Sequence, residues 1–209
     1  MARTLGSPFR LPCFAVALQN SPMVLPIVMY GHPVLRQRGE SVDPKMEGLP
    51  QLIDDMLETM HEASGIGLAA QQIGRAIQLT VIDVSEATDR ESTMWIDDQE
   101  VALNEQMPLV LLNPKITPEP ETELGQEGCL SFPEIYGNVN RPSKIAVEAL
   151  QPDGSTLRFT CAGLLARAVQ HEVDHLQGIL FIDRMDRGEK DQIREQYETL
   201  HQQTKESLA

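Results

Sequence analysis

The most regular pattern of apolar and polar positions begins just after Gly48. Apolar residues then recur in steps of three and one, at Leu49, Leu52, Ile53, Met56, Leu57 and Met60. This spacing places them on one face of an amphipathic helix. Pro50 suits the first turn of a helix and Gly65 lies just past its end, so we predict a helix between them.

Two apolar runs in the middle of the chain predict strands. Ile77–Val84 is typical of a buried strand, and Leu109–Leu112 predicts a short strand that ends at Asn113 and Pro114. Between them, residues 85–107 contain seven acidic residues and one arginine. We expect this acidic segment to be an exposed loop whose charges are simply solvated.

The second half of the chain predicts a hairpin followed by a helix. Lys144–Leu150 and Thr156–Cys161 each alternate apolar and polar residues. The sequence between them, Pro152-Asp153-Gly154, is typical of a turn. The segment Gly163–Leu176 favours a helix, and it contains two histidines.

A last helix is predicted over about 189–205, with only Ile193, Tyr197 and Leu200 to dock it. The order of elements is therefore helix, strands, hairpin, helix and helix. This order predicts an α+β fold with mostly antiparallel strands. We expect the strands to pack around the histidine-bearing helix, with one helix N-terminal and one C-terminal to them.

The 209 residues suit a single domain, which we place at residues 23–209. The formal charge of −14 disfavours a dedicated binder of nucleic acid or anionic membranes, because either needs a basic face. No stretch is apolar over the roughly 20 residues that a membrane span requires. Three cysteines are too few for a disulfide framework, so we expect a reducing, cytoplasmic setting. Of these, Cys161 alternates with apolar residues and is expected in the core.

Residues 1–22 show no helical or strand period, and three interpretations compete. They are an upstream extension of the reading frame with Met23 as the natural start, an organelle transit peptide, or a weak secretory signal. The signal would use the apolar run Leu11–Leu18 and the triplet Ala15-Val16-Ala17, but Pro12 interrupts the run. We favour a disordered or extraneous extension.

The sharpest chemical pattern is HEVDH at residues 171–175. Two histidines four residues apart lie on one helix face, so His171 and His175 can reach one divalent metal. Glu172 can take a proton from a metal-activated water and later hand it on. The alternative is a solvated helix rich in His and Glu, which the apolar residues around the motif disfavour.

A hydrolytic metal site needs a third protein ligand. The extended zinc-protease pattern fails, because Gly178 is present but the third histidine would fall at Phe181. Glu195 and Glu198 have no supporting motif. Cys129 lies in a glycine-flanked, non-helical segment, and its thiolate is a strong ligand for Zn²⁺ or Fe²⁺. We therefore predict Cys129 as the third ligand.

Three segments resemble the motifs of the peptide deformylase family, in the same order and at similar separations. They are GIGLAAQQIG at 65–74, EGCLS at 127–131 and QHEVDH at 170–175, and the tract 178–184 is similar too. The resemblance covers roughly residues 24–186. It implies a hydrolase that removes the N-formyl group from formyl-methionine at the start of newly made polypeptides.

The resemblance also implies one divalent metal held by Cys129, His171 and His175, with water as the fourth ligand. Fe²⁺ is the metal expected in the cell, and Zn²⁺, Ni²⁺ or Co²⁺ could replace it. The partners implied are formyl-methionyl nascent polypeptides and a transient contact with the ribosome.

The catalytic roles follow from the same resemblance. Glu172 becomes the general acid and base, and the side-chain amide of Gln72 and the backbone N–H of Leu130 become donors to the oxyanion. Gly67 offers backbone hydrogen bonds to the substrate chain. A neutral amide suits this task, because it donates without adding a competing ligand charge.

The methionine side chain should lie near the HEVDH helix. Leu164 and Ala168 precede His171 on its own face, and with Ile66 they could line an apolar pocket or simply pack in the core. Arg167 shares that face, and we expect it at the pocket rim or paired with an acid. Asp174 is expected to hold a ligand or a neighbouring strand in place.

Two features depart from the family. The acidic segment 85–107 is longer than the usual connection, and residues 187–209 sum to −1, which offers no electrostatic case for docking on rRNA. The runner-up function is a metallopeptidase that acts on unformylated peptides. A structural metal site in a binding module is less favoured, because such sites usually have four protein ligands and only three good ones are evident.

Overall fold

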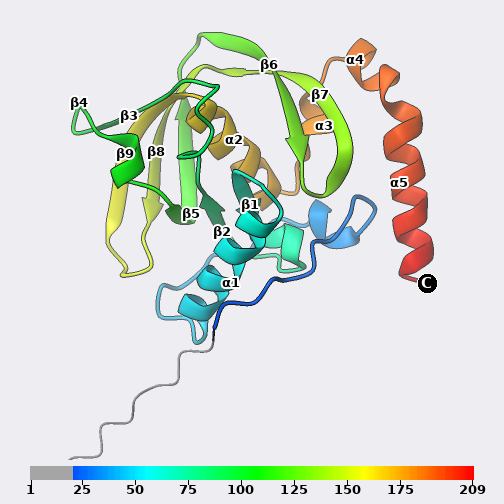
Figure 1. The fold of residues 1–209 in the computed structure, drawn as a ribbon, viewed down its shortest axis with the longest axis horizontal. Helices are drawn as coiled ribbons and strands as arrows, with labels where there is room; N and C mark the ends of the chain where they lie inside the picture. The colour runs from blue at the N-terminus through cyan, green and yellow to red at the C-terminus, as the bar shows by residue number, and fades with distance from the viewer. Residues whose placement is uncertain (1–20) are drawn as a thin grey trace, which may run out of the picture.

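A seven-stranded antiparallel sheet is the largest unit of the computed structural model, which describes residues 21–209 (Figure 1). In spatial order its strands are β1 (Gly67–Ala69), β2 (Leu79–Ile82), β5 (Leu109–Pro118), β8 (Lys144–Leu150), β9 (Thr156–Gly163), β3 (Ser92–Ile96) and β4 (Gln99–Glu100). The strands β6 (Thr122–Cys129) and β7 (Phe132–Pro142) form a separate hairpin. β1 lies at one edge of the large sheet.

Helix α2 (Leu164–Leu176) packs between the large sheet and the hairpin. All of its residues are buried, because strands cover it on both sides. The chain turns into α2 at Gly163, whose φ is +69°, and a Cβ there would lie 2.2 Å from the carbonyl oxygen of Glu91. This turn therefore requires glycine. The prediction of a central helix that carries the HEVDH motif is confirmed.

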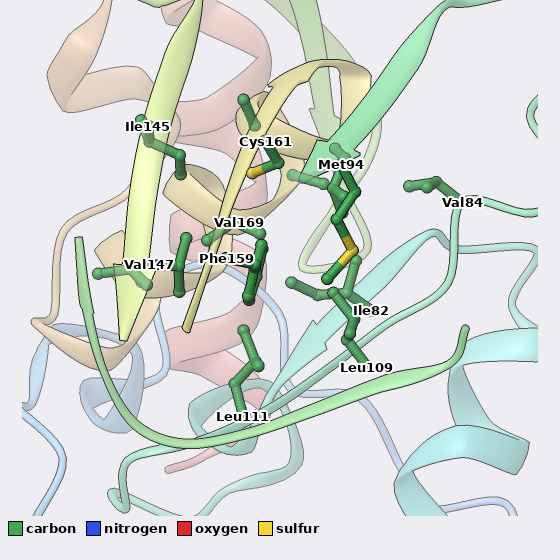
Figure 2. Close-up of a cluster of buried hydrophobic side chains, with 14 of the residues drawn as sticks. Ile82, Val84, Met94, Leu109, Leu111, Ile145, Val147, Phe159, Cys161 and Val169 are labelled. Carbon is green, nitrogen blue, oxygen red and sulfur yellow. The ribbon is translucent and has the colours of Figure 1, made fainter. Parts of the chain in front are cut away.

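The main core lies between the sheet and α2. Met94, Leu111, Phe159 and Val169 come together there from three strands and the helix (Figure 2). Cys161 belongs to this core, as predicted, and burial raises the pKa of its thiol well above the ordinary value. Burying each large apolar side chain stabilises the fold by about 1.5–3 kcal/mol.

The two flanking helical regions each close a smaller core. Helix α1 (Leu49–Glu62) buries the predicted apolar face against β1 and β2. The C-terminal region contains α3 (Phe181–Arg184), α4 (Arg187–Gln192) and α5 (Arg194–Ser207), and α5 lies beside the hairpin (Figure 1). Tyr197 docks α5 against Tyr30 near Phe132.

The structure confirms the α+β class and the helix near 189–205, although a break at Ile193 divides that helix into α4 and α5. The described part of the chain also contains three short 3₁₀ helices: η1 (Pro33–Arg36), η2 (Ala70–Ile73) and η3 (Leu103–Glu105). No helix in the described range has the length and apolar character that a membrane crossing requires. Most of the segment to which the N-terminal hypotheses apply, residues 1–20, lies outside the described residues.

The prediction that residues 85–107 form only an exposed loop is wrong. The segment contains β3, β4 and η3, and β3 pairs with β9 from Ser92 to Trp95. Met94 is fully buried in the main core. One inward side chain therefore anchors a strand whose flanking acids remain in solvent.

The prediction that a short strand ends at Asn113 and Pro114 is also wrong, because β5 continues to Pro118. The pairing shifts at this point: Leu109–Leu112 pair with β2, and β8 pairs with Leu112 and, after an irregularity, with Lys115–Pro118. The φ of Asn113 is +52°, and its side-chain amide exchanges two 2.8 Å hydrogen bonds with the backbone of Val42. This bulge accommodates Pro114, which has no N–H to donate.

Candidate metal centre

Two separate parts of the fold bring the predicted ligands together. Cys129 ends β6 where the hairpin turns toward Phe132, and His171 and His175 lie one turn apart on α2. One ligand atom from each of the three lies within 4.8 Å of the other two. The Sγ of Cys129 lies 3.2 Å from the Nε2 of His175.

These distances fit a single divalent ion. With bonds of ~2.3 Å to sulfur and ~2.0–2.1 Å to nitrogen, tetrahedral geometry separates the two atoms by roughly 3.6 Å. Both histidines are buried and the cysteine is half-buried. Within the described residues no fourth Cys, His or carboxylate joins the group. The donor set of one sulfur and two imidazoles suits Zn²⁺ or Fe²⁺.

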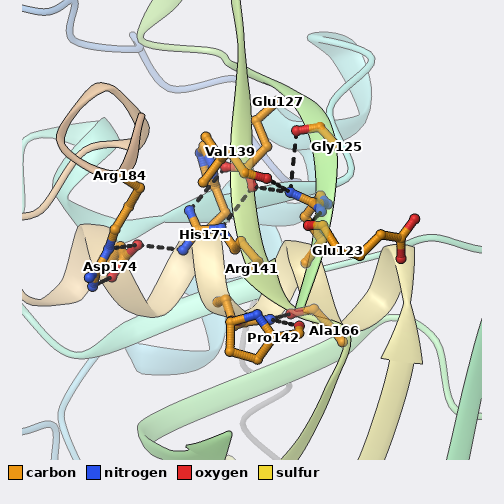
Figure 3. Close-up of polar contacts among 12 residues, drawn as sticks. Glu123, Gly125, Glu127, Val139, Arg141, Pro142, Ala166, His171, Asp174 and Arg184 are labelled. Carbon is orange, nitrogen blue, oxygen red and sulfur yellow. Dashed lines mark hydrogen bonds and ion pairs between the residues drawn. The ribbon is translucent and has the colours of Figure 1, made fainter. Parts of the chain in front are cut away.

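A buried carboxylate orients the first histidine. Glu127 Oε2 lies 3.0 Å from His171 Nδ1, while Glu127 Oε1 accepts hydrogen bonds from Arg141 Nε at 2.7 Å and Arg167 Nη1 at 2.9 Å (Figure 3). Burial opposes the charge of Glu127, but His171 and Arg141 outweigh it and hold its pKa well below the ordinary value. The bond at Nδ1 directs the opposite ring nitrogen of His171 toward the cluster.

The network continues to the surface through Asp174. Its carboxylate accepts hydrogen bonds from Arg141 Nη1 at 2.6 Å and from Arg184 Nη2 at 2.6 Å (Figure 3). Asp174 therefore ties α2 to β7, where Arg141 lies, as predicted for a residue that holds a neighbouring strand. Arg167 is paired with an acid, Glu127, and also lines the cavity at the site, so its prediction at the pocket rim or paired with an acid is confirmed.

The two histidines have opposite protonation tendencies. Burial lowers the pKa of His171, but hydrogen bonds to Cys129 and Glu127 outweigh it, so that the pKa lies well above the ordinary value. Burial and the positive charges of His171 and Arg141 lower the pKa of His175 well below it. A neutral His175 can offer its lone pair to a metal.

Glu172 lies beside the ligands under unusual constraint. It is buried, and its Oε2 has no hydrogen-bond partner in the described part of the chain. Burial raises the pKa of Glu172 to about 7, although His171 and Arg141 oppose the rise. A Cβ on Gly67 would lie 2.4 Å from Glu172 Oε1, so Gly67 leaves the space that this carboxylate occupies.

The predicted oxyanion donors, Gln72 and Leu130, lie near Cys129. Gln72, on η2, is held because its Oε1 accepts a 2.8 Å hydrogen bond from the backbone N–H of Ala69. This leaves its Nε2 facing Cys129 Sγ at 3.5 Å. Leu130 packs against Gly65, where a Cβ would meet its side chain at 2.8 Å. Gln72 and Leu130 both line a cavity that Cys129, His171 and Glu172 also line.

That cavity has a volume of about 600 Å³ and extends from the cluster to the surface. The predicted pocket residues Ile66, Gly67, Leu164 and Ala168 all line it. Ile66 is partly exposed at 37%, whereas Leu164 and Ala168 are buried in the wall. Tyr136 lines the cavity as well, and sequence reasoning did not single it out.

Sequence reasoning also missed Glu127 and Arg141 as partners of the site. Glu127 belongs to the EGCLS segment, and an acid two residues before a candidate ligand was an available signal. Arg141 offered none, because its pairing depends on the register of β6 and β7, which places it opposite Glu123.

Comparison with known proteins places this chain in a family. The family model described as polypeptide deformylase matches residues 24–191. A peptide deformylase from Opitutus terrae is 50% identical over 167 residues, which are 79% of this chain and 86% of the relative. One from Methylacidiphilum infernorum is 41% identical over 178 residues, or 85% of this chain and 93% of the relative. The crystal structure of a plant peptide deformylase, 36% identical, has a TM-score of 0.75 and covers 88% of this chain and 92% of its own. The chain belongs to the polypeptide deformylase family.

Proposed function

We propose that this enzyme removes the formyl group from formyl-methionine at the N-terminus of newly made polypeptides and releases formate. One observation carries the proposal: Cys129, His171 and His175 converge, and Cys129, His171 and Glu172 line one cavity. The membership of a deformylase family supports the same reaction.

Deformylases are metal-dependent, and the residues that would hold the ion here are Cys129, His171 and His175. When bound, the ion acts as a Lewis acid that lowers the pKa of water and polarises the formyl carbonyl group. We propose Fe²⁺ as the metal in the cell, because thiolate and imidazole donors suit it. Zn²⁺, Ni²⁺ or Co²⁺ would occupy the same donors in purified protein.

Glu172 would act as general base and then as general acid. A pKa of about 7, raised by burial, lets its carboxylate accept a proton from the attacking water and still return it near neutral pH. Its carboxylate lines the cavity, and its Oε2 has no hydrogen-bond partner in the described residues that would compete for that proton. Glu172 then gives the proton to the leaving amine, so the C–N bond breaks as a neutral amino terminus forms.

The developing oxyanion on the formyl oxygen would be stabilised by donors that are fixed in advance. The side-chain amide of Gln72 is one such donor, because its Oε1 is already engaged and its Nε2 faces the cluster. The backbone N–H of Leu130 is the other. One donor of this kind is typically worth ~3–4 kcal/mol, or roughly 10²–10³ in rate.

The cavity would select methionine and hold the substrate chain. Leu164, Ala168 and Ile66 form an apolar wall for the thioether side chain. Gly67 lies on β1, which within residues 21–209 is an edge strand that pairs only with β2. The free edge of β1 can hydrogen-bond an extended peptide, as edge strands do.

The test is a formate-release assay on formyl-Met-Ala, with acetyl-Met-Ala and casein as comparison substrates. We expect rapid release of formate from the formyl peptide, little reaction with the acetyl peptide and no cleavage of casein. Cleavage of casein without activity on the formyl peptide would replace this proposal with a metallopeptidase.

A further inference from the structure

Arg167 lies where the two parts of the metal centre meet. Cys129 comes from the hairpin β6–β7, whereas His171 and His175 come from α2. Arg167 is on α2, one turn before His171, and its side chain is buried at 8% exposure. Its guanidinium points into the hairpin, as its hydrogen bonds show.

A single guanidinium reaches both strands of the hairpin. Nη1 donates to the carbonyl oxygen of Val139 on β7 and to Glu127 Oε1 on β6, both at 2.9 Å. Nη2 donates to the carbonyl oxygen of Glu123 on β6 at 2.8 Å. The guanidinium group is planar and its N–H groups point in fixed directions, like the two prongs of a fork. Because this fork must reach all three acceptors, it determines how far the hairpin lies from α2.

Gly125 provides the surface on which this fork rests. A Cβ at Gly125 would lie 2.8 Å from Arg167 Cζ and 2.8 Å from Nη2, so any side chain there would displace the guanidinium. Gly125 does not have a positive φ, which means that its backbone does not itself require glycine. The need for glycine at this position therefore comes from Arg167.

We propose that Arg167, resting on Gly125, is a positioning residue that sets the distance of Cys129 from the two histidines and so determines metal affinity. This inference rests on the metal centre proposed above. Glu127 also pairs with Arg141, which lies on the same hairpin, so its buried carboxylate retains a charged partner when Arg167 is changed. The effect of a change is then geometric.

The experiment measures Co²⁺ affinity by competition with a chelator and records the visible spectrum of the Co²⁺ protein. Arg167→Lys retains the charge but loses the planar fork, and Gly125→Ala retains every charge but displaces the fork. We expect each variant to bind Co²⁺ about 10- to 100-fold more weakly, as for other residues that support metal ligands. The thiolate-to-cobalt band should weaken or shift, because it reports the contact of Cys129 with the ion.

Two control variants separate positioning from general stability. Arg158→Lys alters an exposed arginine of β9 that pairs with Glu148, and it should leave Co²⁺ binding unchanged. Ile145→Val shortens a core side chain of β8 that takes no part in the hydrogen bonds of Arg167. It should lower the stability of the metal-free protein without weakening Co²⁺ binding.

The outcomes are distinct. A wild-type protein without a thiolate-to-cobalt band would contradict the proposed metal centre itself. A wild-type protein with the band, and Arg167→Lys and Gly125→Ala variants that bind Co²⁺ within twofold of it, would overturn the role of Arg167 alone. Weaker binding in Ile145→Val to the same degree would reduce Arg167 to a contributor to stability.

Discussion

Gly67 gives the most direct way to move Glu172 without changing any functional group. Its position carries no side chain, and a Cβ built there lies 2.4 Å from Glu172 Oε1 and 2.9 Å from Cδ. The φ of Gly67 is not positive, so alanine is compatible with the backbone. The substitution Gly67→Ala therefore acts mainly through this one contact.

The size of the effect follows from the distances. Ordinary contact with a Cβ begins at 3.4 Å, so the carboxyl oxygen must retreat by about 1 Å. A misplacement of ~1 Å in a catalytic group can cost ~10²-fold in rate. We therefore expect kcat for formyl-Met-Ala to fall about 100-fold, which corresponds to ~2.7 kcal/mol of activation free energy.

The assay is steady-state formate release, with metal content measured on the same preparations. Gly67→Ala should retain its metal, because Glu172 is not among the proposed ligands. Gly188→Ala is the matched control, since a Cβ there meets no atom within 4 Å and activity should not change. A Gly67→Ala enzyme within threefold of wild-type kcat would refute the proposal that Glu172 must stay where it lies.

Three further predictions test separate parts of the molecule. Glu172→Gln should lower kcat by about 10²–10⁴-fold with metal content unchanged, and near-normal turnover would exclude the general-base role. Gln72→Glu keeps the acceptor for the backbone but removes the donor, so kcat in the formate assay should fall by roughly 10²–10³-fold; an unchanged kcat would exclude it as an oxyanion donor. Burial raises the pKa of Asp183, but Arg36 and a backbone N–H outweigh it, so the pKa lies below its usual 3.8. The carboxylate therefore stabilises the fold above about pH 4, and this contribution is lost as the pH falls through the lowered pKa. In urea denaturation, Asp183→Asn should cost ~0.5–1 kcal/mol at pH 7 and less at pH 3, and an equal cost at both would contradict the sign.

The helices and the β8–β9 hairpin are predictable because each repeats its apolar positions with one period. The face of α1 and the alternation of Ile145, Val147 and Ala149 both appear in the burial pattern. β3 breaks this rule, since Met94 is its one fully buried residue and acids surround it. β5 breaks it too, because the bulge at Asn113 allows a strand to pass through a proline.

The metal ligands are predictable because their residue types and spacing carry chemical meaning without a fold. The supporting residues are not, since their roles depend on the register of the hairpin. Glu127 lies 44 residues before His171, and Arg141 reaches Glu127 across the β6–β7 hairpin. Only the packing of the hairpin on α2 brings these charges together.

X-ray absorption at the metal edge of anaerobically purified protein tests the metal centre most directly. We predict one ion per chain with one sulfur neighbour at ~2.3 Å and nitrogen or oxygen neighbours at ~2.0–2.2 Å. The sulfur contribution should disappear in Cys129→Ser. A wild-type spectrum without sulfur, or one with two sulfur neighbours, would contradict a centre built from Cys129, His171 and His175.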